Sequence, residues 1–132
     1  MIRKHIIMIM LVILAVIGGL SIVLFSLQRE KATMLSDVGK FDLNEYRWEI
    51  ETFSLDKNVG QVNNKKIAIE KAKSLWNEQS YNFINERRIK VDYDCREESW
   101  HIYGTLPRNT LGGVPHAIIR KSGETLAVWV DD

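Results

Sequence analysis

The apolar positions of this chain form one long uninterrupted run near the N-terminus and several short periodic patterns after it. Residues 6–27 carry no charged side chain. At about 1.5 Å per residue, a helix over this stretch is about 33 Å long, enough to cross the roughly 30 Å hydrocarbon layer of a bilayer. The run therefore predicts a membrane-spanning helix at Ile6–Leu27.

A cleaved secretory signal peptide is the alternative interpretation of this run. Such a peptide usually has an apolar region of about 7–15 residues that ends at a small-x-small cleavage site. Here the run is longer and leads directly into Arg29, Glu30 and Lys31, so we favour an uncleaved signal anchor. Arg3 and Lys4 precede the run, and the positive-inside rule gives only a slight bias for a domain outside the cytoplasm.

Two segments follow the apolar run before the first regular pattern. Residues 28–40 are charged and rich in small residues, as in a juxtamembrane linker. Residues 41–55 are ambiguous: Tyr46, Trp48 and Ile50 alternate with charged residues as in a half-buried strand, yet the apolar positions also suit one face of a helix. We favour a strand at residues 45–51.

The clearest periodic pattern of the remaining chain follows the turn signal Asn58-Val59-Gly60. Apolar residues recur at helical spacing from residue 65 to 79, with charged residues between them. Asn63 or Asn64 is suited to cap the N-terminus of this helix. The pattern predicts an amphipathic helix whose buried stripe is Ile67, Ala68, Ala72, Leu75 and Trp76.

Alternating segments separated by turn residues make up the rest of the chain. A hairpin is predicted from residues 89–95 and 100–106 around the polar turn 96–98, and a second hairpin from residues 114–121 and 124–130 around Ser122-Gly123. Residues 107–113 form a loop. The predicted fold class is α+β, with one main helix packed on a curved antiparallel sheet.

Composition narrows the classes of function. The chain has 18 Lys and Arg against 17 Asp and Glu, and the signs are interspersed, so no nucleic-acid-binding surface is expected. One cysteine permits neither an intramolecular disulfide nor a cysteine-based zinc site. We expect no cofactor and no metal.

Candidate catalytic residues are few. His101 and His116 fall on two different predicted strands, and Asp92 or Asp94, on a neighbouring strand, is the carboxylate that a His–Asp pair would use. Two histidines without a flanking ligand motif are more simply partly exposed strand residues, and no nucleophile, metalloprotease or phosphate-binding motif is present. Trp48, Trp76, Trp100 and Trp129 are more simply core residues than a ligand cage. The residues alone predict a domain that is not an enzyme.

Three C-terminal motifs and one upstream motif carry a family resemblance: Trp100–Pro107 (WHIYGTLP), Leu111–Lys121 (LGGVPHAIIRK), Ser122–Trp129 (SGETLAVW) and Val59–Ala72 (VGQVNNKKIAIEKA). In this order and spacing they resemble the NTF2-fold immunity proteins of bacterial polymorphic toxin systems. The resemblance covers about residues 58–130. It implies a cystatin-like cone fold and a protein that binds and neutralises a cognate toxin.

The resemblance also implies roles for individual residues and partners. Because binding residues concentrate on loops held by rigid sheets, the expected toxin contacts are Arg108, Asn109, Leu111, Val114, Pro115 and His116. The expected structural positions are Trp100, Gly104, Thr105, Leu106, Pro107, Gly112, Gly113 and Gly123. The expected partners are a toxin domain, the bilayer through Ile6–Leu27 and, since related cone folds often pair through their sheets, a second copy.

The predicted organisation is a membrane anchor at residues 1–30, a linker and lead-in segment at 31–57 and an NTF2-like immunity domain at 58–132. Two alternatives stay open. One is a PepSY-like inhibitory or regulatory module of the cell envelope. The other is a small NTF2-like enzyme, which requires His101 or His116 within hydrogen-bond reach of a carboxylate in a deep apolar pocket.

Overall fold

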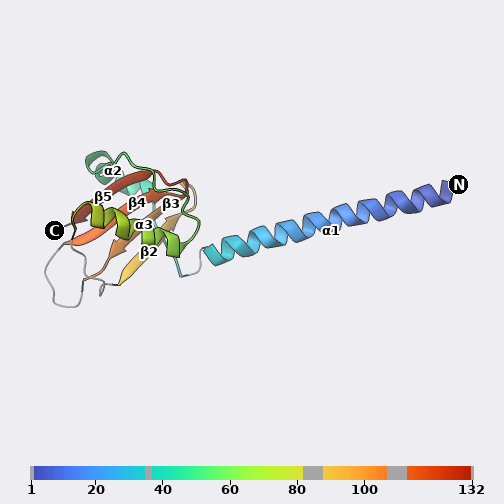
Figure 1. Cartoon of the computed structure of the whole chain (residues 1–132), viewed down its shortest axis with the longest axis horizontal. Helices are drawn as coiled ribbons and strands as arrows, with labels where there is room; N and C mark the ends of the chain where they lie inside the picture. The colour runs from blue at the N-terminus through green and yellow to red at the C-terminus, as the bar shows by residue number, and fades with distance from the viewer. Residues whose placement is uncertain (1, 35–36, 82–87, 107–112, 132) are drawn as a thin grey trace. The chain divides into compact units, whose positions relative to one another are not determined.

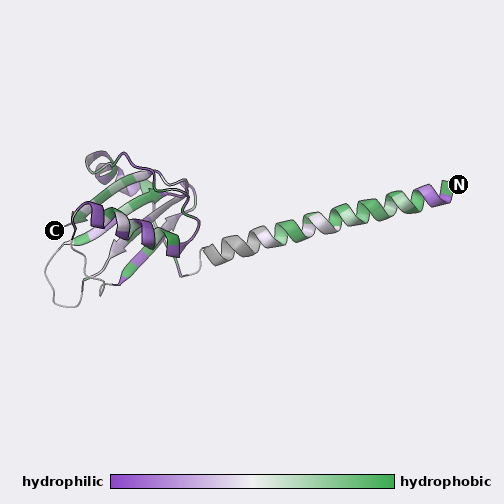
Figure 2. Ribbon diagram, in the orientation of Figure 1, coloured by the Kyte–Doolittle hydropathy of each residue, from purple (hydrophilic) through white to green (hydrophobic). Residues whose placement is uncertain are grey.

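The chain divides into two compact units, residues 1–34 and residues 35–132. The computed structural model describes residues 2–34, 37–81, 88–106 and 113–131. The first unit is a single helix, α1 (Ile2–Met34), which is hydrophobic over most of its length (Figures 1 and 2). Its segment Ile2–Ser26 is long and apolar enough to cross a membrane, and its position near the N-terminus fits a signal sequence equally well. The helix continues to Met34, through residues assigned above to the linker.

The second unit is a five-stranded mixed sheet with helical layers on its two faces. Its elements are β1 (Gly39–Lys40), η1 (Leu43–Tyr46), α2 (Arg47–Thr52), α3 (Lys65–Glu78), β2 (Ile89–Asp94), β3 (Ser99–Gly104), β4 (Val114–Arg120) and β5 (Thr125–Asp131). The strands lie in the order β1-β2-β3-β4-β5. The four predicted strands are confirmed and pair antiparallel, whereas the short β1, which was not predicted, pairs parallel with β2.

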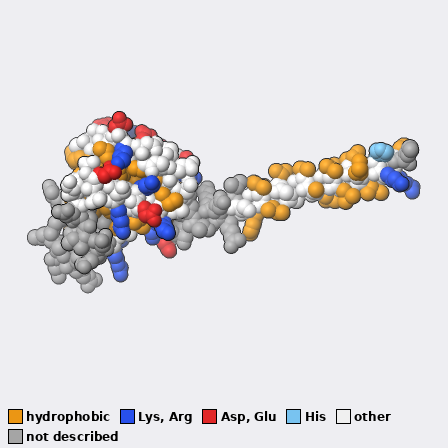
Figure 3. Space-filling view, in the orientation of Figure 1, with side chains coloured by type: hydrophobic (Ala, Val, Ile, Leu, Met, Phe, Trp, Pro, Cys, Tyr) orange, Lys and Arg blue, Asp and Glu red, His pale blue; other side chains and the backbone are white. Residues whose placement is uncertain are grey.

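Helix α3 covers one face of the sheet, as predicted (Figure 1). Asn64 is its N-cap, because the Asn64 side chain accepts a hydrogen bond of 2.9 Å from the Ile67 amide. Helix α3 packs against β2, β3 and β4, and Trp100 and Ile102 of β3 are fully buried. The Trp100 indole N–H donates to the Val62 carbonyl at 2.9 Å, so the largest core side chain also has its polar atom satisfied. Figure 3 shows Lys, Arg and carboxylate side chains interspersed on the face that α3 covers.

The opposite face of the sheet is covered by η1 and α2, which corrects the strand predicted at residues 45–51. Asp42 caps η1 by accepting from the Asn44 amide at 3.0 Å. Helical spacing then turns Tyr46 and Ile50 onto the core cluster of the sheet, while Trp48 faces solvent. In a strand these three side chains would all lie on one face, whereas in the helix Trp48 lies apart from the other two. The apolar pattern of the sequence fits both arrangements, so it could not distinguish a strand from a helix.

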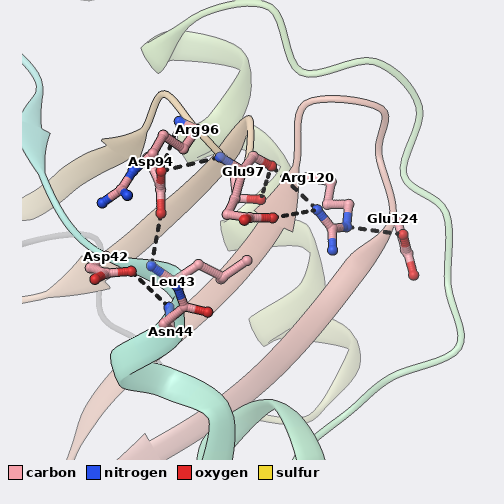
Figure 4. A network of polar contacts seen from close by, with 9 residues as sticks. Asp42, Leu43, Asn44, Asp94, Arg96, Glu97, Arg120 and Glu124 are labelled. Carbon is pink, nitrogen blue, oxygen red and sulfur yellow. Dashed lines mark hydrogen bonds and ion pairs between the residues drawn. The ribbon is translucent and has the colours of Figure 1, made fainter.

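A carboxylate network ties this helical layer to the turn between β2 and β3 (Figure 4). The Asp94 carboxylate accepts from the backbone N–H groups of Leu43 and Arg96, both at 2.9 Å, and of Glu97 at 3.2 Å. Burial acts to raise the pKa of Asp94, but the three N–H donors together hold it below its usual value. Asp94 therefore anchors the start of η1 as an ionised group.

Candidate functional site

Strand register brings two histidines and two aromatic residues into adjacent rows on the sheet face beneath η1 and α2. Tyr103 of β3 pairs with His116 of β4, which pairs with Trp129 of β5. His101, two residues before Tyr103, lies one row along the same face. Because side chains alternate between the two faces of a strand, the strand register is sufficient to place all four side chains on the same face of the sheet.

The rings of this face form a continuous stack. His116 stacks on Trp129 with ring centroids 4.5 Å apart and on His101 at 5.1 Å. The Tyr103 ring lies 4.7 Å from that of His101. From the helical layer, the Tyr46 ring closes over His101 at 4.8 Å. This packing leaves His101 only 2% exposed and His116 9% exposed.

The two histidines and a carboxylate form a hydrogen-bonded chain within the stack. His101 Nε2 lies 2.8 Å from His116 Nδ1, and His116 Nε2 lies 2.8 Å from Asp131 Oδ2. A carboxylate only accepts, so His116 Nε2–H donates to Asp131, and the remaining Nδ1 of a neutral His116 accepts from His101 Nε2–H. The chain therefore fixes one tautomer of each imidazole.

Burial keeps both imidazoles neutral near neutral pH. It lowers the pKa of His101 to about 3, with the neighbouring His116 adding to the effect. Burial also lowers the pKa of His116, although the charges of Asp131 and Glu49 act in the opposite direction. The expectation that both histidines are partly exposed strand residues was wrong: they are buried and bonded to each other.

Several carboxylates surround the outer end of this stack. Burial, followed by the charges of Asp92, Glu45, Glu49 and Asp131, raises the pKa of the Tyr46 hydroxyl. The Tyr103 hydroxyl donates to Asp92. The Asp131 side chain is 53% exposed, so the histidine chain ends on a carboxylate that faces solvent.

The carboxylates expected beside the histidines serve other groups. Asp92 pairs in register with His101 but is bonded by Tyr103, and Asp94 holds backbone N–H groups. Asp131, near the end of the last strand, is the residue that sequence reasoning missed. Only the pairing of Val114 with Asp131 across β4 and β5 reveals it.

Two polar atoms of this region are buried without a hydrogen-bond partner, His101 Nδ1 and Glu49 Oε2. No group of three or more metal-ligating side chains occurs within the described parts of the chain. The tightly packed rings instead make the His101–His116–Asp131 chain a polar element of the core. One condition of the enzyme hypothesis, a histidine bonded to a carboxylate, is met, but on Asp131 rather than on Asp92 or Asp94.

The predicted toxin contacts fall into two groups. Arg108, Asn109 and Leu111 lie outside the described residues. Of the others, Val114 is partly exposed, whereas Pro115 and His116 are buried.

Several predicted structural positions have identifiable surroundings. Trp100 is fully buried, and a side-chain carbon at Gly104 would lie 3.0 Å from the Pro115 ring. Thr105 bonds the Arg88 carbonyl through its amide and its hydroxyl. Leu106 is partly buried. A side chain at Gly113 would collide with Val130, and Gly123 takes a φ of +103° in the β4–β5 turn. Pro107 and Gly112 lie outside the described residues.

The mixed sheet with its main helix on one face defines a small α+β domain of the NTF2-like type. Residues 67–129 match the family model described as NTF2 fold immunity protein. The match begins in the first turn of α3 and ends in β5, and this domain belongs to that family, whose members are not enzymes. No curated protein and no solved structure matches the chain significantly.

Proposed function

We propose that this chain is a membrane-anchored immunity protein that binds and neutralises a cognate polymorphic toxin. The family match over residues 67–129 carries the proposal, since an immunity protein implies a toxin partner. The physical requirements are a rigid scaffold and a complementary surface with a few anchor residues. The ring stack and the Asp94 network are consistent with such a scaffold.

The membrane anchor rests on α1. Its apolar segment exceeds the usual apolar region of a signal peptide, and its described side chains are exposed, as for a helix surrounded by lipid. An uncleaved anchor predicts full-length mass in the carbonate-resistant membrane fraction. A shorter, soluble mature chain would mean that α1 is a signal sequence.

The contact surface proposed from the sequence is the loop from Arg108 to Pro115 with His116 beside it. Val114 pairs with Asp131, so the end of this loop lies next to the exposed carboxylate of the histidine chain. Replacing Arg108 and Asn109 together by Ala is expected to weaken toxin binding without changing the thermal midpoint. A homodimer through the sheet stays a prediction, tested by sedimentation of the full chain in detergent.

Direct binding tests the proposal. The full chain, purified in detergent, is mixed with the C-terminal domain of whichever large secreted protein is encoded beside it, and complex formation is followed by gel filtration and calorimetry. We expect a stable complex with this domain and none with a non-cognate toxin domain of similar charge. Absence of binding by a folded chain would contradict the proposal and favour the regulatory module of the envelope.

A further inference from the structure

Trp48 is unusual among the side chains of the compact domain. Among the described residues outside α1, it is the one large apolar side chain that is mostly exposed, at 65%. A tryptophan buries a large area when it is covered, and Trp is among the residues most enriched at the energetic centres of protein interfaces. An exposed indole on a small domain therefore indicates a surface that is covered by a partner.

The indole of Trp48 is held by the core beneath it. Its ring packs edge-on against Phe53 at 5.7 Å, and Phe53 stacks on Trp129 of β5 at 6.2 Å. The Phe53 carbonyl accepts from the Val128 amide at 3.2 Å, which fixes this segment to the edge of β5. A side chain held in this way loses less conformational entropy on binding than a free one.

The charge around Trp48 indicates the chemistry of the partner. Glu45 and Glu51 are exposed, Glu49 is partly exposed, and Arg47 is the one cation of η1 and α2. In the part of the chain that the structure describes, none of these three glutamates forms an ion pair with Lys or Arg. Figure 3 shows carboxylate side chains along the upper edge of the domain, on the side where Figure 1 places α2.

This surface is continuous with the histidine chain. The Asp131 carboxylate lies 2.8 Å from His116 Nε2, and the charge of Glu49 acts on the pKa of the same ring. A chain of ring contacts also leads from Trp48 to His116: Trp48 packs on Phe53, Phe53 stacks on Trp129, and Trp129 stacks on His116. The exposed side chains of Trp48, Glu45 and Glu51 thus belong to the layer formed by η1 and α2, and the exposed carboxylate of Asp131 ends the histidine chain beneath that layer.

We propose that this surface, the Trp48 face (Glu45, Trp48, Glu49, Glu51 and Asp131), is a docking surface for a basic region of the toxin. The Trp48 indole enters an apolar recess of the toxin, and Lys or Arg side chains around that recess pair with the carboxylates. This inference rests on the proposed function and names the surface and partner chemistry that the sequence did not assign. An anionic membrane surface is the less fitting occupant, because the carboxylates repel it.

Binding of the neighbouring toxin domain to the full chain in neutral-lipid nanodiscs tests the inference. Trp48→Ala is expected to weaken binding at least about 30-fold, the loss typical of an interface centre. Glu51→Lys is expected to weaken binding about 10-fold at low salt and less at 0.5 M salt, because exposed charge pairs are screened. Glu70→Lys, an exposed charge reversal on α3, is the matched control and is expected to leave binding unchanged.

The outcomes separate this inference from the function on which it rests. Wild-type binding with no loss in Trp48→Ala would overturn the Trp48 face and leave toxin neutralisation standing. No binding by the wild-type chain would overturn both. Quenching by brominated lipid that disappears in Trp48→Phe would place this face on the bilayer and would also overturn the inference. Circular dichroism of each variant confirms that the fold is kept, since the substituted side chains are exposed.

Discussion

The Nε2 atom of His101 lies 2.8 Å from the Nδ1 atom of His116, with the two rings nearly parallel at 12°. The pair crosses from β3 to β4 beneath Tyr46 and ends on the Asp131 carboxylate. Burial holds both imidazoles neutral, and if both rings were protonated a donor would face a donor across this contact. The core of the domain therefore contains a group whose protonation opposes folding.

Acidification is expected to destabilise the domain well above the usual range of carboxylates. Because the folded pKa of His101 is about 3 and the unfolded value about 6.5, the folded state binds fewer protons and stability is lost as the pH falls below 6.5. At pH 5, His101 alone accounts for about 2 kcal/mol. Urea midpoints measured between pH 7 and 4 test this expectation.

His101→Gln supplies the comparison for that measurement. The variant is expected to be less stable at pH 7, because the buried bond to His116 is altered, yet to lose less stability between pH 6.5 and 4. A wild-type midpoint that stays constant over this range would show that the imidazole is not held neutral by burial.

Removal of the Asp94 carboxylate is expected to be among the most costly single changes in the domain. Asp94→Ala leaves three backbone N–H groups without their acceptor, and each bond to a charged group contributes about 1.5–3 kcal/mol. We expect a loss of at least about 3 kcal/mol in the free energy of unfolding, measured by urea denaturation. Asp56→Ala, at an exposed position, is the control, and equal losses in the two variants would contradict the role given to Asp94.

Two glycines with positive φ provide a matched pair. Gly60 has a φ of +82° and open space around it, whereas Gly123 has a φ of +103° and lies against the Gly60 backbone. Gly60→Ala is expected to cost about 1 kcal/mol from backbone strain alone. Gly123→Ala should cost clearly more, because its new methyl group also collides with Gly60. Thermal midpoints in the reverse order would show that the approach of the two turns is not tight.

The start of α3 can be tested at neighbouring asparagines. Asn64→Ala removes the side-chain acceptor of the Ile67 amide and is expected to cost about 1 kcal/mol. Asn63→Ala, one residue earlier and exposed, should cost less than half as much. Equal losses would mean that the cap contributes little beyond local propensity.

The helices and strands whose apolar residues follow one clear periodicity were predictable from the sequence. Helix α3 and strands β2 to β5 carry helical or alternating patterns bounded by turn residues, and their order leaves few ways to bury both apolar faces. The residues of η1 and α2 satisfy both periods, so only their packing against the sheet decides between helix and strand. Strand β1 has two residues and carries no pattern of its own.

The candidate site was less predictable because it depends on register. His101 and His116 are visible in the sequence, but which carboxylate reaches them depends on the pairing of Val114 with Asp131. Trp48 likewise has the sequence context of a core residue, and one helical turn places it outside. The local sequence pattern predicts the helices and strands, whereas the surroundings of the histidines and of Trp48 depend on contacts between residues that are distant in the sequence.

The most direct test of the account is a growth measurement. The C-terminal domain of whichever large secreted protein is encoded next to this chain is expressed in a sensitive host, with and without the full-length chain. The account predicts that the domain arrests growth alone and that co-expression restores it, while a chain whose α3 residue Trp76 is changed to Asp, which disrupts the core, gives no protection. Growth arrest that persists with a well-expressed, folded wild-type chain would contradict the account.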